Sequence, residues 1–317
     1  MKKRWILALD VLFILTLAAC SGSGAEQPLL SDTPAPELTL TAPAPTPVIT
    51  TKPAASNGPE KSQTHEVSVK IAAIRVREGD TLERDIIPQL KDAFSMSENQ
   101  VKDALARAKS SLIKAAGFRR MEGMIVPGTY DIKGESLEYW ISEWIDGAEK
   151  RYERLAASVS EKNDLSAEQR IILASVVEGD TNLAGSYEDV VAAVYQNRIK
   201  KNDRFGSCPT VEYAIGYQRP YLTKDDTNVD SKYNTYKHRG LPPGPLCCFG
   251  DESLKASISK PIDTKLYFFF YDYVKKQILS FNNIEDFRAA GKESKALFEA
   301  TFEISRFEKM ADKRDFF

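Results

Sequence analysis

The segment Ile171-Ile-Leu-Ala-Ser-Val-Val-Glu-Gly-Asp-Thr181 carries the clearest structural signal in this chain of 317 residues. Its apolar residues are nearly continuous, and Ser166 and Gln169 in front of it form the Ser-x-x-Gln pattern that caps the start of a helix. We therefore predict a buried helix from Ile171 to about Glu178. Asp180 then lies just past the helix end, where the negative end of the helix dipole disfavours a charged carboxylate and raises its pKa.

Patterns typical of helices and of strands surround this segment, so we predict an α+β fold. Trp140 and Trp144 lie on one face of a predicted helix, and we interpret them as core side chains rather than as a platform for a sugar ring. Helices are predicted to start at Ser97, where Gln100 completes a capping box, at Ser136 and at Ser186, and strands are predicted at 69–76, 266–271 and 277–281.

The first twenty residues have the pattern of a bacterial export signal. Basic residues Lys2 to Arg4 precede an apolar stretch, Trp5 to Leu17, which is too short to span a membrane comfortably. Leu17-Ala-Ala-Cys20 resembles the lipobox, in which the cysteine is acylated and becomes the new N-terminus. We expect residues 1–20 to be a lipoprotein signal peptide and Cys20 to anchor the chain to the membrane, with the folded part in the cell envelope outside the cytoplasm. The alternative is an ordinary secretory signal with a chance cysteine.

Composition separates a tether from the folded part. Residues 21–66 are rich in Pro, Ala, Thr and Ser, and such a segment cannot bury enough apolar surface to offset the entropy of ordering it. We predict a disordered, semi-extended tether there. The whole chain has 43 basic and 45 acidic residues, a net charge of −2 and no long basic run, which argues against a nucleic-acid partner.

Several motifs of the folded part resemble those of the endolytic murein transglycosylase family, also called YceG-like. Residues 171–181 resemble its signature helix, usually Leu-Ala-Ser-Ile-Val-Glu-Lys-Glu-Thr. No single motif carries the resemblance, which covers roughly Val67 to Phe287. The further motifs are Glu122-Gly-x-x-x-Pro127-Gly-Thr129-Tyr130, Val194-Tyr-Gln-Asn197-Arg198, Cys208-Pro-Thr210-Val-Glu-Tyr213, Tyr233-Asn234-Thr235-Tyr236 and Gly240-Leu-Pro-Pro-Gly-Pro245.

This resemblance implies an activity and a domain organisation. The activity is non-hydrolytic cleavage of the β-1,4 bond between N-acetylmuramic acid and N-acetylglucosamine within peptidoglycan glycan strands, which leaves 1,6-anhydromuramoyl ends. It implies work beside the cell-wall synthases and requires no metal or cofactor. The organisation is a small LysM-like α/β subdomain over residues 67–133, followed by an α+β catalytic domain over residues 134–317.

The resemblance places the family's catalytic glutamate on Asp180, the glutamate before it on Glu178, and the lysine between them on Gly179. A carboxyl at position 180 would protonate the leaving oxygen and then accept the C6 proton of the sugar. Asp is one methylene shorter than Glu, and a displacement of about 1 Å can cost ~10²-fold in rate. Positions i and i+2 point to different sides of a helix, so Glu178 cannot simply replace Asp180, although Gly179 permits a left-handed helix end that would re-aim the backbone. We expect Asp180 to face the substrate.

The same motifs imply substrate contacts. Asn197 is expected to bind N-acetyl or hydroxyl groups, Arg198 to hold muropeptide carboxylates, and the loop residues Tyr233, Asn234 and Tyr236 to line a sugar groove. Each has a structural alternative. Asn197 would be a helix amide that binds the backbone, Arg198 a solvated surface arginine, and the three loop residues would anchor their loop. The substrate-binding candidates are Asn197, Arg198, Thr210, Tyr213, Tyr233, Asn234 and Tyr236.

Three cysteines remain besides the proposed lipid anchor. Cys208, Cys247 and Cys248 lie in motif loops where the family usually has other residues. In an exported protein this favours a disulfide from Cys208 to Cys247 or Cys248, and the alternative is free thiols. Their spacing does not resemble a zinc site, and the lone His238 gives no metal site.

Three functions remain open from the sequence. The first is an active endolytic transglycosylase. The second is a catalytically impaired glycan-binding or scaffold lipoprotein, suggested by the changed residues at 179 and 180 and by Leu279-Ser280-Phe281 in place of a late His-x-Phe element of the family. The third is a hydrolase in which Asp180 and Glu178 act as a pair with water.

Overall fold

The computed structural model describes residues 72–182, 184–218 and 222–301. The predicted signal peptide at 1–20, the lipid anchor Cys20 and the tether at 21–66 lie outside the described residues. Those features therefore stay predictions.

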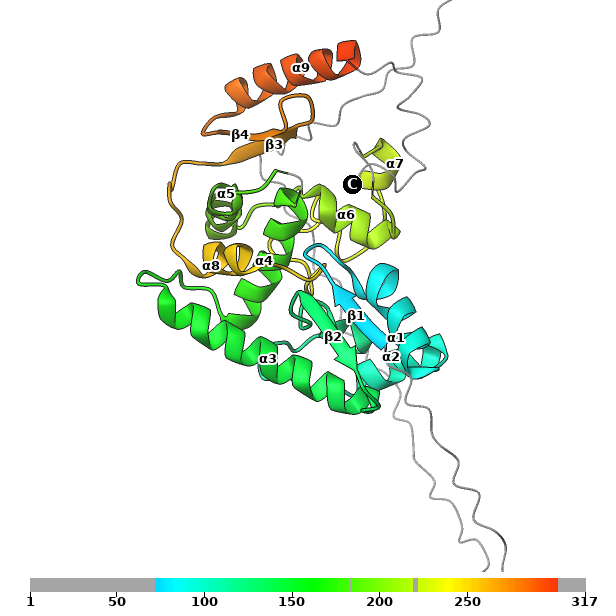
Figure 1. Ribbon diagram of the computed structural model, residues 1–317. Coiled ribbons are helices and arrows are strands. Elements are labelled where there is room, and N and C mark those ends of the chain that lie inside the picture. The colour runs from blue at the N-terminus through cyan, green and yellow to red at the C-terminus, as the bar shows by residue number, and fades with distance from the viewer. Residues whose placement is uncertain (1–71, 183, 219–221, 302–317) are drawn as a thin grey trace, which may run out of the picture. The chain divides into compact units, whose positions relative to one another are not determined.

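The described part begins with a strand pair, and the two helices that lie between these strands in the sequence lie beside the pair in space (Figure 1). Strand β1 (Ala72–Val76) pairs antiparallel with β2 (Gly128–Ile132), with Ile74 opposite Tyr130. Between them lie the π-helical turn η1 (Leu82–Ile86), α1 (Ile87–Phe94), α2 (Glu98–Ala106) and the 3-10 turn η2 (Phe118–Met121). This order agrees with the small α/β subdomain that the sequence predicts, and the capping box of Ser97 and Gln100 at the start of α2 is confirmed.

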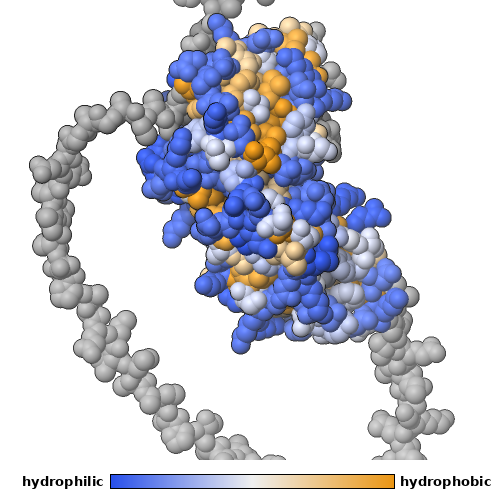
Figure 2. Space-filling model, turned by 90° about the vertical axis from the view of Figure 1, so that its left-hand side faces the viewer, coloured by the Kyte–Doolittle hydropathy of each residue, from blue (hydrophilic) through white to orange (hydrophobic). Residues whose placement is uncertain are grey.

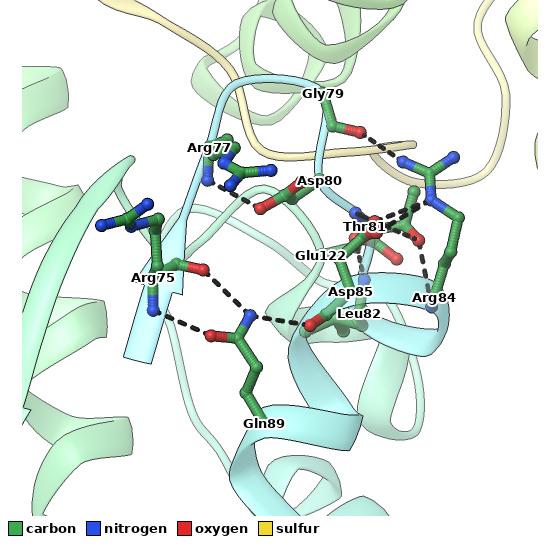
Figure 3. A network of polar contacts seen from close by, with 10 residues as sticks. All are labelled: Arg75, Arg77, Gly79, Asp80, Thr81, Leu82, Arg84, Asp85, Gln89 and Glu122. Carbon is green, nitrogen blue, oxygen red and sulfur yellow. Dashed lines mark hydrogen bonds and ion pairs between the residues drawn. The ribbon is translucent and has the colours of Figure 1, made fainter. Parts of the chain in front are cut away.

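A network of polar contacts holds β1 against the helices that follow it (Figure 3). The side-chain amide of Gln89 donates to the carbonyl oxygens of Arg75 and Asp85, at 2.9 and 2.8 Å, and its oxygen accepts from the Arg75 backbone N–H. The carboxylate of Glu122 accepts a hydrogen bond of 3.0 Å from the backbone N–H of Leu82. Glu122 thereby satisfies an amide at the start of η1 that has no helical partner.

The second half of the chain is mainly helical, and α4 (Ala167–Thr181) lies at its centre, in contact with α5, α6 and α8 (Figure 1). Ser166 caps α4 through a capping box with Gln169, as the sequence predicts. The surrounding helices are α3 (Leu137–Ser158), α5 (Glu188–Lys200), α6 (Cys208–Ile215), α7 (Lys224–Thr227) and α8 (Asp251–Ile258).

A second strand pair closes the described chain. Strands β3 (Phe268–Asp272) and β4 (Gln277–Phe281) pair antiparallel, and α9 (Ile284–Thr301) packs against both. The predicted strand pair is thus confirmed. Figure 2 shows a face on which hydrophilic side chains predominate and hydrophobic ones form narrow strips between them.

Two clusters of buried apolar side chains form the core, and α4 contributes to both. Ile171 and Ala174 belong to a cluster that also contains Leu82 and Trp144, which confirms Trp144 as a core residue. Trp140 packs against that cluster and is partly buried. Leu173, Val176 and Val177, on the other faces of α4, belong to the second cluster. Burial on every side explains why the apolar run in α4 is nearly continuous.

Two expectations about helix ends are wrong. Helix α4 continues to Thr181, so Asp180 lies in its last turn rather than beyond it, and Gly179 keeps a helical backbone instead of a left-handed helix end. Gly179 packs closely against α6 there, since a Cβ at this position would lie 2.7 Å from the Pro209 Cβ. Ser186 does not cap α5, because its φ is +55° and Tyr187 occupies the N-cap position.

Candidate active site

The carboxylate of Asp180 accepts two hydrogen bonds through one of its oxygens. The hydroxyl of Tyr195 donates to Oδ2 at 2.6 Å, and the hydroxyl of Ser207 donates to the same oxygen at 3.0 Å. Tyr195 comes from α5, and Ser207 is the residue just before α6. Asp180 itself is partly buried. Three separate segments thus converge on one acidic group.

Burial raises the pKa of Asp180 to about 6. The hydrogen bonds from Tyr195 and Ser207 and the positive charge of Arg198 favour the carboxylate and limit this rise. A carboxyl whose pKa lies near 6 is protonated often enough near neutral pH to donate a proton and can take one back afterwards. The raised pKa expected for Asp180 is therefore confirmed in direction, with burial rather than a helix-end position as its cause.

Glu178 points to a different part of the structure. Its Oε2 accepts from the backbone N–H of Gly250 at 2.9 Å and from the Ser253 hydroxyl at 2.7 Å. These groups lie at the start of α8, which has no side-chain cap of its own. Glu178 is 5% exposed and caps α8 from outside. The two carboxylates therefore bind different segments and do not converge on one space.

Several of the predicted substrate contacts instead hold the fold together. The amide of Asn197 donates to the carbonyls of Asp263 and Leu266, at 2.9 and 2.8 Å, and the amide of Asn234 donates to those of Thr227 and Val229. Both side chains are buried. Asn197 is thus a helix amide satisfied by the backbone, and Asn234 anchors its loop.

Arg198 and Thr210 also have internal partners. The guanidinium of Arg198 is partly buried and donates to the carbonyl oxygens of Tyr267 and Phe205. The Thr210 hydroxyl donates to the Ser207 carbonyl at 2.7 Å and lies 2.8 Å from the Thr235 hydroxyl. These contacts fix the segment that presents Ser207 to Asp180.

Tyr213 and Tyr233 form a separate aromatic pair, with ring centroids 4.7 Å apart. The Tyr213 hydroxyl donates to Oε2 of Glu122 at 2.9 Å, and the guanidinium of Arg119 lies 4.9 Å from the centre of the Tyr213 ring. Burial raises the pKa of Glu122 to about 8. Both tyrosines are partly buried, so each ring retains some exposed surface.

The predicted disulfide is not formed, and Cys208, Cys247 and Cys248 are free thiols. Cys247 and Cys248 are buried, and the Cys247 thiol donates to the Ser175 carbonyl at 3.3 Å. Cys208 is exposed, and its Sγ lies 3.2 Å from the Tyr236 hydroxyl. Cys208, the first residue of α6, therefore points toward Tyr236 rather than toward the buried pair.

Sequence reasoning missed Tyr195, Ser207 and Glu122. A tyrosine among the apolar residues of a helix signals a buried hydroxyl that needs a partner, but the sequence does not identify that partner. Glu122 lies within the motif that ends at Tyr130, and Ser207 directly precedes the motif that begins at Cys208. Each acts through a contact with a residue at least 15 positions away in the chain.

A cavity of about 420 Å³ lies at the other end of α4, among Ile172, Ile199, Leu241, Pro242 and Pro243. It does not include Asp180. Within residues 72–182, 184–218 and 222–301, no group of three His, Cys, Asp or Glu side chains is arranged to hold a metal ion. The helices of this described part also include none with the length and apolar character needed to cross a membrane.

Comparison with known proteins gives concordant matches. The sequence model of the YceG-like family matches residues 56–292. A protein of Streptococcus pneumoniae serotype 2 (strain D39) named endolytic murein transglycosylase is 30% identical over 243 residues, which is 68% of this chain and 43% of that protein. A protein of Bacillus subtilis (strain 168) with the same name is 30% identical over 203 residues, 63% of this chain and 55% of that protein.

The fold is similar to a crystal structure of a YceG-like protein from Listeria monocytogenes. The TM-score is 0.58 at 24% sequence identity, covering 69% of this chain and 76% of that one. At that identity the likeness bears on the fold alone. The chain spans about half the length of the curated relatives it matches.

Proposed function

The chain belongs to the YceG-like family, and from that membership we propose that it is an endolytic peptidoglycan lytic transglycosylase with Asp180 as its acid and base. The observation that supports this proposal is the environment of Asp180, a partly buried carboxyl with a pKa of about 6 and hydrogen bonds on one oxygen only among the described residues. The names of the two curated relatives support the same reaction class.

The proposed reaction needs one carboxyl and no water. Protonated Asp180 donates its proton to O4 of the departing N-acetylglucosamine as the bond from C1 of N-acetylmuramic acid to that oxygen breaks. The Asp180 carboxylate then accepts the proton of the C6 hydroxyl as O6 forms a bond to C1. The products are a free 4-hydroxyl and a 1,6-anhydromuramoyl end, and Asp180 is again protonated.

Glu178 supports this assignment by its position. An inverting or retaining hydrolase would need two carboxyl groups on either side of the scissile bond. Glu178 is bound to Gly250 and Ser253 at the start of α8, so it is a poor second carboxyl for a site built around Asp180. Because Glu178 is engaged at α8, the arrangement favours the transglycosylase reaction over a hydrolase that pairs Glu178 with Asp180.

The expected place of action follows from the same proposal. Glycan strands of the cell wall would be the substrate, and the lipid on Cys20 and the tether at 21–66 would hold the enzyme at the membrane and let it reach the strands beside the cell-wall synthases. Radiolabelled palmitate incorporation tests the anchor, and Cys20→Ala should abolish the label and release the protein from the membrane.

Product analysis tests the activity. Purified glycan strands are digested with the wild type, Asp180→Asn and Glu178→Gln, and the ends are identified by mass spectrometry. We expect anhydro ends from the wild type and from Glu178→Gln, and none from Asp180→Asn, whose unfolding midpoint serves as the control for folding.

The other outcomes identify the rival functions. Strand binding without any cleavage by the wild type would leave a glycan-binding or scaffold lipoprotein. Reducing ends that incorporate oxygen from labelled solvent would identify a hydrolase.

A further inference from the structure

We propose that Tyr195 is the positioning residue of the candidate active site, and that its hydroxyl and the Asp180 carboxylate act as one unit. This inference rests on the proposed function for its kinetic consequence, but the contact itself is a property of the fold. The Tyr195 hydroxyl lies 2.6 Å from Oδ2 of Asp180, at the short end of the range for such hydrogen bonds.

Two aromatic contacts and burial leave the Tyr195 ring little freedom. The ring stacks on Phe205, with centroids 4.5 Å apart and planes at 18°, and meets Phe269 edge-on at 5.5 Å. Tyr195 is 1% exposed and Phe205 is completely buried. The guanidinium of Arg198, one turn further along α5, donates to the Phe205 carbonyl and so holds the stacked segment in place. A hydroxyl on such a ring has a fixed position.

This fixed hydroxyl decides which oxygen of Asp180 is available for chemistry. Tyr195 and Ser207 both donate to Oδ2, and among the described residues Oδ1 has no donor. Tyr195 remains a donor across the working pH range, because burial raises its pKa well above the ordinary value. The two hydroxyls therefore orient the carboxyl so that Oδ1 carries the proton toward the substrate.

The same contact makes the lengths of the two side chains interdependent. The Tyr195 hydroxyl occupies the space directly beyond Oδ2, so a carboxyl one methylene longer at position 180 would meet the phenol oxygen. Gly179 and Pro209 restrict adjustment of the neighbouring backbone, since even a Cβ at position 179 would lie 2.7 Å from the Pro209 Cβ. An aspartate fits this site, and a glutamate would need the hydroxyl to be absent.

The first experiment measures Tyr195→Phe, which removes one oxygen atom and keeps the stacked ring. The hydrogen bond favours the carboxylate, so its loss should raise the Asp180 pKa by about one pH unit. Carboxyl carbon NMR titration reads this pKa directly and needs no catalysis. In glycan cleavage, the fall in rate at high pH should move upward by the same amount, and kcat on the low-pH plateau should fall about 10- to 100-fold with little change in KM.

Tyr130→Phe is the matched control, because the Tyr130 hydroxyl donates to the Val126 carbonyl and does not contact Asp180. It should leave both the titration and the rate profile unchanged. An Asp180 pKa in Tyr195→Phe equal to that of the wild type would overturn the inference. If the wild type cleaves nothing while the NMR shift is present, the proposed function fails and the positioning contact stands.

The second experiment combines Asp180→Glu with Tyr195→Phe and measures urea unfolding midpoints of both singles and the double variant. Because removal of the hydroxyl makes room for the longer carboxyl, the double variant should lose less stability than the sum of the two single losses. Additive losses would show that the two side chains do not share this space and would contradict the inference.

Discussion

At the scale of single residues, the charge of Asp180 is set by burial, and this gives the proposed activity a defined pH dependence. Proton donation needs the neutral carboxyl, and its pKa is about 6. The cleavage rate should therefore be constant at low pH and fall as the pH rises through about 6, by about tenfold per pH unit beyond it. Initial rates on purified glycan strands between pH 4 and 8 measure this. A rate that rises over the same interval would contradict the acid role.

Glu122 makes a second prediction at this scale, which concerns stability. Its pKa is about 8 in the folded protein against 4.5 ordinarily, so between these values the folded state keeps a proton that the unfolded chain has lost. The contribution of Glu122 to the free energy of unfolding is thus fully present below about pH 4.5. It falls as the pH rises toward 8, by up to about 1.4 kcal/mol per pH unit.

Glu122→Gln isolates that effect. The amide can still accept from Leu82 N–H through its oxygen and meet the Tyr213 hydroxyl through its nitrogen, but it binds no proton in this range. The stability of the variant relative to the wild type should increase between pH 5 and pH 8, measured by urea unfolding at each pH. Parallel stability curves for the two proteins would refute the assignment.

At the scale of elements, the approach of α6 to α4 builds the candidate site. Gly179 in α4 touches Pro209 in α6, and Ser207, two residues before that proline, binds Asp180. Gly179→Ala would place a Cβ 2.7 Å from the Pro209 Cβ, so the helices must separate. We expect a loss of about 1–3 kcal/mol in unfolding free energy and reduced cleavage.

Gly147→Ala in α3 is the matched control for this change. Gly147 is also helical, but no atom lies within 4 Å of a Cβ built there. The unfolding free energy of Gly147→Ala should exceed that of the wild type by about 0.5–1 kcal/mol, because alanine loses less backbone entropy in a helix than glycine does. Equal effects of the two substitutions on stability would show that the contact between α4 and α6 is not tight.

At the scale of the whole molecule, one core joins the parts that the sequence divides at residue 133. The first apolar cluster combines Leu82 and Leu105 with Ile171 of α4 and with Phe249 and Leu254. Polar contacts cross the same boundary, as Glu122 binds Tyr213. Residues 72–133 therefore share an apolar core with the rest of the described chain rather than having a separate interior.

This shared core predicts cooperative unfolding. A protein of residues 67–301 should unfold in a single transition monitored by circular dichroism and by tryptophan fluorescence. A fragment of residues 134–301 should lack a cooperative transition, because it would expose the apolar faces of α4 and α8. An independent transition for that fragment would support two autonomous domains instead.

Much of the fold follows from local patterns in the sequence. The capping boxes at Ser97 and Ser166, the apolar run of α4 and the strand pair near the C-terminus each depend on residues close together in the chain, and the structure confirms them. The motifs likewise identified the family, which the match of the YceG-like model to residues 56–292 confirms. Ser186 is the counterexample, since the left-handed backbone at that residue follows from how the chain enters α5.

The sequence by itself thus determined the class of fold and the family, because periodicity and motif order are local properties of the chain. Only the tertiary structure decided which partners each of the two carboxylates has. Glu178 and Asp180 are two residues apart in the sequence, but they bind different segments. Glu178 accepts hydrogen bonds from the start of α8, whereas Asp180 accepts them from Tyr195 and Ser207. Burial and hydrogen bonding between distant segments set a pKa, and no local pattern encodes them.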